Sequence, residues 1–468
     1  MEHRDVSRAR PMSLINSLFS AQSGLRAANA GVNATSNNVA NSATPGYNRR
    51  AVDQVTANPT RAGRLNYGNG SSVSAIGRSS DNLLNMRRLK EAGAAVSSET
   101  EYYQLTSIER LFDETQSTTP RGELDAFFDS LSLATADPSD LGLRKQVAHT
   151  AQRLAESINR TSNSIDEGRT TYKNNIESSL PLINNKLAEI ADLNAKIMGA
   201  GGAMGAGDLA DRRDQIIRDL SERAGITADL TADGQATVYM GGHAIVSKSE
   251  ARPLSLNNGP PISISVKAGG GDIDVSADAG GELGGYLESY RKATDYLDQL
   301  NTFTEDFATA INGQHAAGFD RTGTAGGALF TFTPGASAQS LDFSDAIMDD
   351  VNLLAFAGAA AGDAGDADNL TLMYDLQDLN IIDGGTSTAH DYIVALTTQV
   401  GNDVAESERM ANTQHAVLDD LDELYNNLHG VDMDEEAANL VMYQSAYQAS
   451  AKVITVTNEL MSNLMNLV

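Results

Sequence analysis

The chain contains no cysteine, and this absence excludes three kinds of chemistry at once. Disulfide bonds, thiolate metal sites and cysteine nucleophiles all require that side chain. A chain without cysteine also suits a protein that passes from a reducing to an oxidising compartment, because it has no thiol that could be trapped on the way.

Basic residues and long apolar runs are scarce as well. The 468 residues include 34 Lys and Arg against 62 Asp and Glu, a formal net charge of −28. No basic run is available to neutralise phosphates, so we expect no nucleic-acid partner. No apolar stretch approaches the roughly 18 to 20 residues that span a bilayer, so we expect no membrane partner. Polar residues interrupt the apolar segment near the N-terminus, which argues against a cleavable signal peptide.

The sequence shows no arrangement typical of an active site. Its seven histidines are dispersed and form no H-E-x-x-H pair. Asp363, Asp366 and Asp368 are the best metal candidates, but they lack the spacing and the final glutamate of an EF-hand loop. A turn followed by a helix cap explains them better. We therefore predict no catalytic residues, no metal and no cofactor, and a protein that is not an enzyme.

Heptad spacing at both ends of the chain is the strongest pattern. Apolar or small residues alternate at intervals of four and three near the N-terminus: Leu14, Leu18, Ala21, Leu25, Ala28, Val32, Thr35 and Val39. A similar stripe runs close to the C-terminus: Leu440, Tyr447, Ala451, Ile454, Met461, Met465 and Val468. Such spacing is typical of a coiled-coil seam. Asp432 and Glu435 resemble a capping box, so we expect the last helix to begin near residue 433.

The interior alternates between helical and strand patterns. Helical periods cover 86–112, 141–197, 209–224, 287–311 and 393–428, with a glycine-rich loop at 199–207 and a predicted kink or break at Pro181. Between 226 and 275 the period changes to two. The predicted fold is mainly α with a small inserted β domain in a nested rod. Residues 1–60 and 430–468 form a terminal coiled coil, 61–224 and 281–429 a helical bundle, and 225–280 a β domain at the tip.

A motif follows the first helix. Residues 36–49 read S-N-N-V-A-N-S-A-T-P-G-Y-N-R and include Asn37, Asn38, Asn41, Pro45, Gly46 and Tyr47. As local chemistry, Pro then Gly predicts a type II turn that ends the helix. The segment also resembles the N-terminal signature of flagellar rod, hook and hook-associated proteins. Residues 125–131, which contain Phe127 and Phe128, resemble the hook-associated protein 1 (FlgK) family more narrowly, and the segments 211–215, 312–320 and 431–436 occur in that family's order.

The resemblance implies a structural subunit at the junction between hook and filament. Such a protein is exported unfolded by the flagellar type III system without a cleaved signal peptide and works outside the cell. The implied partners are further copies in a ring, the hook protein, a second hook-associated junction protein and an export chaperone. The residues predicted to mediate assembly are Leu14, Leu18, Leu25, Val32, Val39, Leu440, Tyr447, Ile454, Met461 and Leu464.

Two other expectations accompany this interpretation. The family resemblance places the natural start at Met12, and it implies that this chain lacks an additional domain that another family member has after Gly318-Phe319-Asp320. The alternatives are another axial protein, either a second junction protein or a flagellin-like subunit, and a secreted adhesin that uses the β domain.

Overall fold

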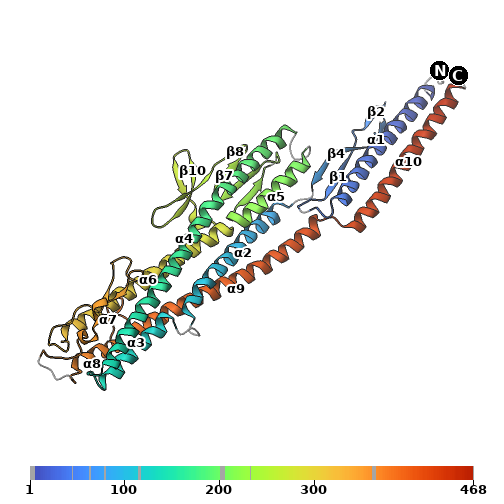
Figure 1. The fold of residues 1–468 in the computed structure, drawn as a ribbon. Coiled ribbons are helices and arrows are strands. Elements are labelled where there is room, and N and C mark those ends of the chain that lie inside the picture. The colour runs from blue at the N-terminus through green and yellow to red at the C-terminus, as the bar shows by residue number, and fades with distance from the viewer. Residues whose placement is uncertain are drawn as a thin grey trace.

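The computed structural model is an elongated rod whose two termini lie together at one end (Figure 1). It describes residues 6–44, 46–62, 65–78, 81–113, 118–200, 206–231, 233–360 and 365–466. The terminal end is a pair of long helices, α1 (Val6–Ala40) and α10 (Met433–Met465). The predicted start of the last helix is confirmed, because the Asp432 side chain accepts hydrogen bonds from the backbone N–H groups of Asp434 and Glu435. α1 extends N-terminal of Met12, although residues 1–11 carry no helical apolar period.

The two terminal helices run antiparallel, as the positions of two α1 glycines show. A Cβ on Gly31 would lie 2.4 Å from the Tyr443 ring, and one on Gly24 would lie 2.9 Å from Ser450 Oγ. Ala21, Ala28 and Thr35 of the predicted seam are buried, whereas Leu18, Leu25 and Val32 are only half-buried. The predicted seam is therefore rotated relative to the contact with α10, because glycine allows a closer approach of the helices than leucine or valine does.

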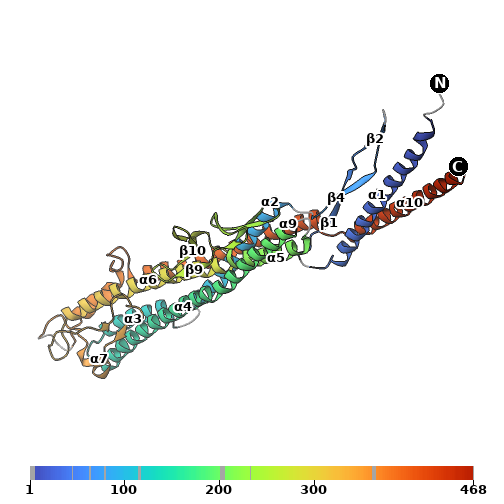
Figure 2. The same cartoon turned by 90° about the horizontal axis from the view of Figure 1, so that it is seen from above.

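A β-ribbon that the sequence patterns did not predict packs along α1. Its long strands are β1 (Arg50–Thr56) and β4 (Ser71–Arg78), which pair antiparallel with Arg50 opposite Arg78. The short strands β2 (Thr60–Ala62) and β3 (Leu65–Tyr67) form a second hairpin between them. Seen from above, α1 lies between this ribbon and α10 (Figure 2). The predicted boundary at residue 60 is thus wrong, since it cuts through the ribbon.

Beyond the terminal helices, the rod is a bundle of long helices. Its members are α2 (Asn82–Glu109) with η1 (Arg110–Phe112), α3 (Pro120–Thr135), α4 (Leu141–Gly199), α5 (Gly207–Ala224), α6 (Gly281–Ala317) and α9 (Ala389–His429). Side chains cap several N-termini, as Asp81, Thr119 and Asp140 do for α2, α3 and α4. The predicted break at Pro181 is wrong: α4 continues through it. Pro181 and Glu177 are both exposed, so the backbone bond that proline removes lies on the solvent side.

The predicted β domain exists, but it lies on the flank of the rod rather than at the tip (Figure 1). Its strands form a four-stranded and a three-stranded antiparallel sheet: β5 (Thr227–Leu230), β6 (Ala236–Met240), β7 (His243–Ser247), β8 (Glu250–Ala251), β9 (Leu254–Asn257), β10 (Ser263–Ala268) and β11 (Gly271–Asp274), followed by η2 (Ser276–Asp278). Val238 and Ile264 are buried in one core with Ile183 and Leu187 of α4. The apolar face of the sheets therefore needs α4, which holds the β domain midway along the rod.

The end of the rod opposite the termini is built instead from α3 and the segment after α6. Its short elements are β12 (Phe330–Thr331), β13 (Asp342–Phe343), α7 (Asp345–Asp349), η3 (Val351–Leu353), α8 (Asp368–Asp375) and η4 (Leu376–Asp378). The core there is aromatic. The Phe127 ring lies 6.1 Å from that of Phe307 and 6.2 Å from that of Phe330, both in edge-on geometry.

We expect Phe127→Ala to lower the free energy of unfolding by about 3 to 5 kcal/mol, because it removes a fully buried ring and leaves a cavity. Denaturant unfolding followed by circular dichroism measures this change. Leu133→Ala, on the same helix but 53% exposed, is the control and should change stability by less than about 0.5 kcal/mol. Equal effects of the two substitutions would contradict the assignment of Phe127 to the core.

Candidate functional site

The segment that joins α1 to the β-ribbon is organised around the buried side chain of Asn38. Its amide donates to the Arg50 carbonyl at 3.0 Å, and its carbonyl oxygen accepts from Arg50 N and from the Tyr47 hydroxyl, both at 2.9 Å. One side chain thus pairs with both backbone groups of Arg50 and closes the turn. Gly46 has φ +77°, and a Cβ there would lie 2.5 Å from the Gln215 side-chain oxygen. Pro45 lies outside the described residues.

The other motif asparagines have smaller roles. Asn41 donates to the Asn37 carbonyl at 2.9 Å; Asn37 is exposed and Asn41 is half-buried. Asn48, which follows Tyr47, accepts a hydrogen bond from the Tyr425 hydroxyl at 2.5 Å and donates to Asp211 at 3.4 Å. The motif therefore reaches both α9 and α5.

Arg49 connects this segment to the start of α10. Its guanidinium lies 2.7 Å from Glu435 and 2.7 Å from Glu436, and its backbone N–H donates to the His429 carbonyl at 3.2 Å. The Glu436 side chain is almost completely buried. Both carboxylates lie in the first turn of α10, where the helix dipole favours negative charge. Glu435 and Glu436 therefore interact both with Arg49 and with the N-terminus of their own helix.

Arg50 and Arg78 connect the base of the ribbon to α5. Arg78 lies 2.9 Å from Asp211 and 2.6 Å from Asp214, while Arg50 pairs with Asp208 and lies 3.6 Å from Asp211. Burial by itself lowers the pKa of Arg78, but the charges of Asp214 and Asp211 outweigh it and the pKa is raised. Burial also raises the pKa of Asp211, against the opposing effect of Arg78. The ion pairs are thus partly desolvated.

These contacts define what we call the elbow cluster, located where the terminal helices meet the bundle. Its members are Asn38, Tyr47, Arg49, Arg50, Arg78, Asp208, Asp211, Asp214, Glu435 and Glu436. Three segments singled out separately in the sequence, 36–49, 211–215 and 431–436, meet here. Sequence reasoning missed Arg50, Arg78 and Asp208. The three-residue spacing of Asp208, Asp211 and Asp214 was a usable signal, because it places the carboxylates on neighbouring positions of one helix.

A second set of motif residues meets at the opposite end of the rod. Phe127 and Phe128 are buried in the aromatic core. Asn312 accepts from the N–H groups of Leu329 and Phe330 and donates to the Phe330 carbonyl, which holds β12 against α6. Arg144 is buried and donates to the carbonyls of Pro138, Val351 and Leu354. Burial lowers its pKa to about 10. These residues order the loops of the distal end.

His315 is a further buried member of this distal set. Its Nδ1 lies 2.7 Å from the Gly327 carbonyl, and its Nε2 lies 2.9 Å from the backbone N of Ala355. A carbonyl requires a donor at Nδ1 and an N–H requires an acceptor at Nε2, so the neutral imidazole fits both. Burial lowers the pKa of His315, in agreement with that geometry.

The predicted assembly residues occupy a thinly packed part of the protein. In α1, Leu14, Leu18, Leu25, Val32 and Val39 are all half-buried. In α10, Leu440, Ile454 and Met461 are half-buried, while Tyr447 and Leu464 are exposed. Further apolar side chains of α10 are exposed along its length: Val441, Met442, Val453, Val456 and Leu460. The folded chain therefore leaves much of the apolar surface of this helix in contact with solvent.

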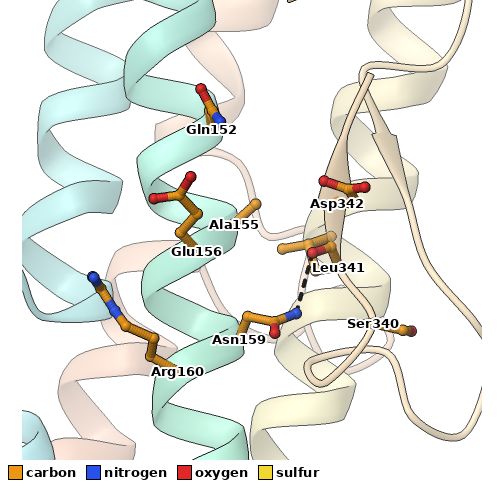
Figure 3. Close-up of a pocket in the computed structure, with 8 residues that line it drawn as sticks. All are labelled: Gln152, Ala155, Glu156, Asn159, Arg160, Ser340, Leu341 and Asp342. Atoms are coloured by element: carbon orange, nitrogen blue, oxygen red, sulfur yellow. Dashed lines mark hydrogen bonds between the residues drawn. The ribbon is translucent and has the colours of Figure 1, made fainter. Parts of the chain in front are cut away.

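A surface cleft of about 540 Å³ lies between α4 and the segment 340–342 (Figure 3). Asn159 of α4 donates to the carbonyls of Gln339 and Leu341 and so ties the segment to the helix. Within the described residues, no group of three or more His, Cys, Asp or Glu could hold a metal ion. In the same residues, no helix is long and apolar enough to cross a membrane.

Comparison with known proteins places these features in a family. Residues 105–330 match the family described as the flagellar hook-associated protein FlgK helical domain, and residues 426–467 match the C-terminal family of the flagellar basal body rod proteins FlgEFG. Flagellar hook-associated protein 1 of Salmonella typhimurium is 27% identical over 97% of this chain and 100% of that protein. The Bacillus subtilis protein of that name is 27% identical over 96% of this chain and 97% of its own length.

The chain belongs to the flagellar hook-associated protein 1 family. The fold agrees with this assignment: the solved structure of the flagellar hook junction protein FlgK from Burkholderia pseudomallei superposes with a TM-score of 0.64, covering 74% of this chain and 100% of that one at 14% identity. The alignment to the Salmonella protein runs over 555 positions, more than this chain contains, so that member of the hook-associated protein 1 family has segments without a counterpart here.

We expect Asn38→Ala to loosen the elbow cluster. The substitution leaves Arg50 N, the Arg50 carbonyl and the Tyr47 hydroxyl without their partner, at a cost of about 1 to 3 kcal/mol for each group that stays buried and unpaired. Hydrogen exchange of the Arg50 amide should accelerate at least tenfold. Asn37→Ala, at the exposed neighbouring position, should leave that rate unchanged. Equal protection in both variants would show that Asn38 does not hold the turn.

We expect the stability of the distal end to fall between pH 7 and pH 5. The pKa of His315 is lowered in the folded state, so the unfolded chain, with an ordinary pKa of about 6.5, binds the additional proton. Stability is therefore present above that value and is lost as the pH falls. His315→Gln should show a shallower dependence of Tm on pH than the native protein. His149→Gln, at an exposed position of α4, should keep the native slope, and identical slopes in all three proteins would refute the assignment.

Proposed function

We propose that the protein is a structural subunit at the junction between hook and filament, and that its terminal helices assemble with neighbouring subunits. The names of its relatives suggest the position, since one is called a flagellar hook junction protein and others hook-associated protein 1. The observation that carries the assembly role is the apolar surface of α10, which the rest of the described chain leaves exposed. Large exposed apolar surfaces mark interaction sites.

Charge distribution supports assembly through the same helices. Between residues 11 and 40 the only charged side chain is Arg26, and between 437 and 465 the only ones are Lys452 and Glu459. These two segments together carry a net charge of +1, whereas the whole chain carries −28. Identical subunits repel one another along the acidic rod. The terminal helices can approach their counterparts without that repulsion.

Thin packing supports folding that is coupled to assembly. Among the described residues of α10, only Glu436 and Thr457 are buried. Isolated helices with so little tertiary support are marginal in water, so the pair gains its order when neighbours cover it. We propose that the chain is exported unfolded by the flagellar type III route, that a chaperone holds α10 until export, and that ordering occurs at the growing tip. The hook protein and a second junction protein are the proposed neighbours, outside the cell.

The alternative roles are less well supported. A second junction protein or a flagellin-like subunit shares terminal heptads, but residues 105–330 match the FlgK helical domain family. An adhesin would use the β domain, but that domain lies on the flank of the rod with its apolar face against α4.

The direct test is deletion of the gene in the native bacterium, followed by electron microscopy of the cells and assay of flagellin in the medium. We expect hooks without filaments and flagellin in the medium, because the filament would have no junction on which to grow. Normal filaments would reject the junction role.

We expect Val456→Glu to prevent filament formation when it replaces the native protein. Val456 is 40% exposed on α10, and a carboxylate there would have to be buried between apolar subunit surfaces. Filaments per cell, counted by electron microscopy, should fall at least tenfold. Thr455→Glu places the same charge at the adjacent exposed position, about 100° around the helix, and should retain filaments. Loss of filaments in both variants would show that charge alone, and not the apolar surface, is decisive.

A further inference from the structure

A groove of about 620 Å³ lies where α1, α10 and the β-ribbon meet. Its walls are mostly small side chains: Ser17, Ser20 and Ala21 of α1, Ala449 and Ser450 of α10, and Gly68 between β3 and β4, with Asn16 of α1 beside them. None of these residues carries a charge. Such a groove admits a bulky side chain, together with the helix that carries it, because small residues allow close approach of a helix backbone.

The apolar stripe of α10 extends from this groove. Val453 lines the groove, and Leu460 lies seven residues further, about 20° around the helix and therefore on the same face. Both side chains are nearly half exposed, and Val456 lies between them. The groove thus has an apolar wall that continues toward the chain end.

The face of α1 that points away from α10 carries two bulky apolar side chains that stay partly exposed. Phe19 is 54% exposed, and Ile15, one turn earlier, is also exposed. Phe19 lies about 140° and Ile15 about 180° around α1 from Gly24, which faces α10. These side chains therefore point away from the groove of their own molecule.

We infer that the groove binds the Phe19 face of α1 from a second copy of this chain. The inference rests on the proposed assembly role and specifies its contact. Two observations identify the occupant. The groove and the bulky face occur on the same helix pair. This pair is nearly uncharged in a chain with net charge −28, so a second copy can approach it without strong electrostatic repulsion. Because the two faces differ, the contact is heterologous. It continues from copy to copy instead of closing a two-fold dimer, as a ring requires.

The absence of cysteine permits a direct test by disulfide crosslinking in assembled flagella. Ile15→Cys places a thiol on the bulky face and keeps Phe19, and Ala449→Cys places one in the groove. Flagella from cells that carry the double variant are oxidised and run on a non-reducing gel. We expect a ladder of dimers, trimers and larger multimers, and no multimers from either single variant. The pair Ile15→Cys with Thr455→Cys, which faces away from the groove, is the control and should give no ladder.

The outcomes separate this contact from the proposed function. Normal filaments without a ladder, or crosslinks only to another flagellar protein, would overturn the contact and leave the junction role intact. Dimers from a single variant would show a two-fold contact and also overturn it. If the double variant does not assemble, Ser20→Phe provides a second measurement. A phenyl side chain that fills the groove should reduce filament number at least tenfold, whereas Asn29→Phe on the exposed face of α1 should not. Normal filaments with Ser20→Phe would contradict the inference.

Discussion

The arrangement of the whole rod depends on ion pairs between three arginines and five carboxylates at the elbow cluster. Arg49 holds the start of α10, while Arg50 and Arg78 hold α5, and all three lie at the base of one β-ribbon. Partly buried ion pairs add little net stability, because desolvation offsets their attraction. They do require a definite geometry. We therefore interpret the cluster as the element that fixes how the terminal helices meet the bundle.

The two sides of the elbow differ in how they are stabilised. The bundle has two extensive cores, one aromatic around Phe127 and Phe307 and one that joins α4 to the β sheets. The terminal helices contact each other mainly through small residues, and α10 leaves many of its larger apolar side chains exposed. A stable rod is thus connected to a less stable helix pair whose apolar side chains need neighbouring subunits to cover them. This difference in local stability suits a subunit that assembles through its terminal helices.

Several predictions from the sequence succeeded because they depended on local signals. The start of α10 followed from Asp432 and the acidic residues after it, which cap a helix wherever it is placed. The β domain followed from a change of period at residue 226. The β-ribbon was missed because its second strand, Ser71–Arg78, is rich in serine and small residues and has no strong alternation. The actual contact face of α1 was missed because a search for apolar periodicity does not count glycine, and glycines mark the positions where α1 and α10 approach each other most closely.

The sequence by itself determined most of the long helices, the existence of the β domain, the cysteine-free and acidic character of the chain, and the family resemblance carried by its motifs. These are properties of neighbouring residues. Only the tertiary structure decided that the segments 36–49, 211–215 and 431–436 meet in one cluster, that the β domain lies on the flank of the rod, and that Phe19 and the groove face opposite ways. Contacts between residues hundreds of positions apart, such as Arg49 with Glu436, depend on the packing of whole helices, and no local pattern encodes that packing.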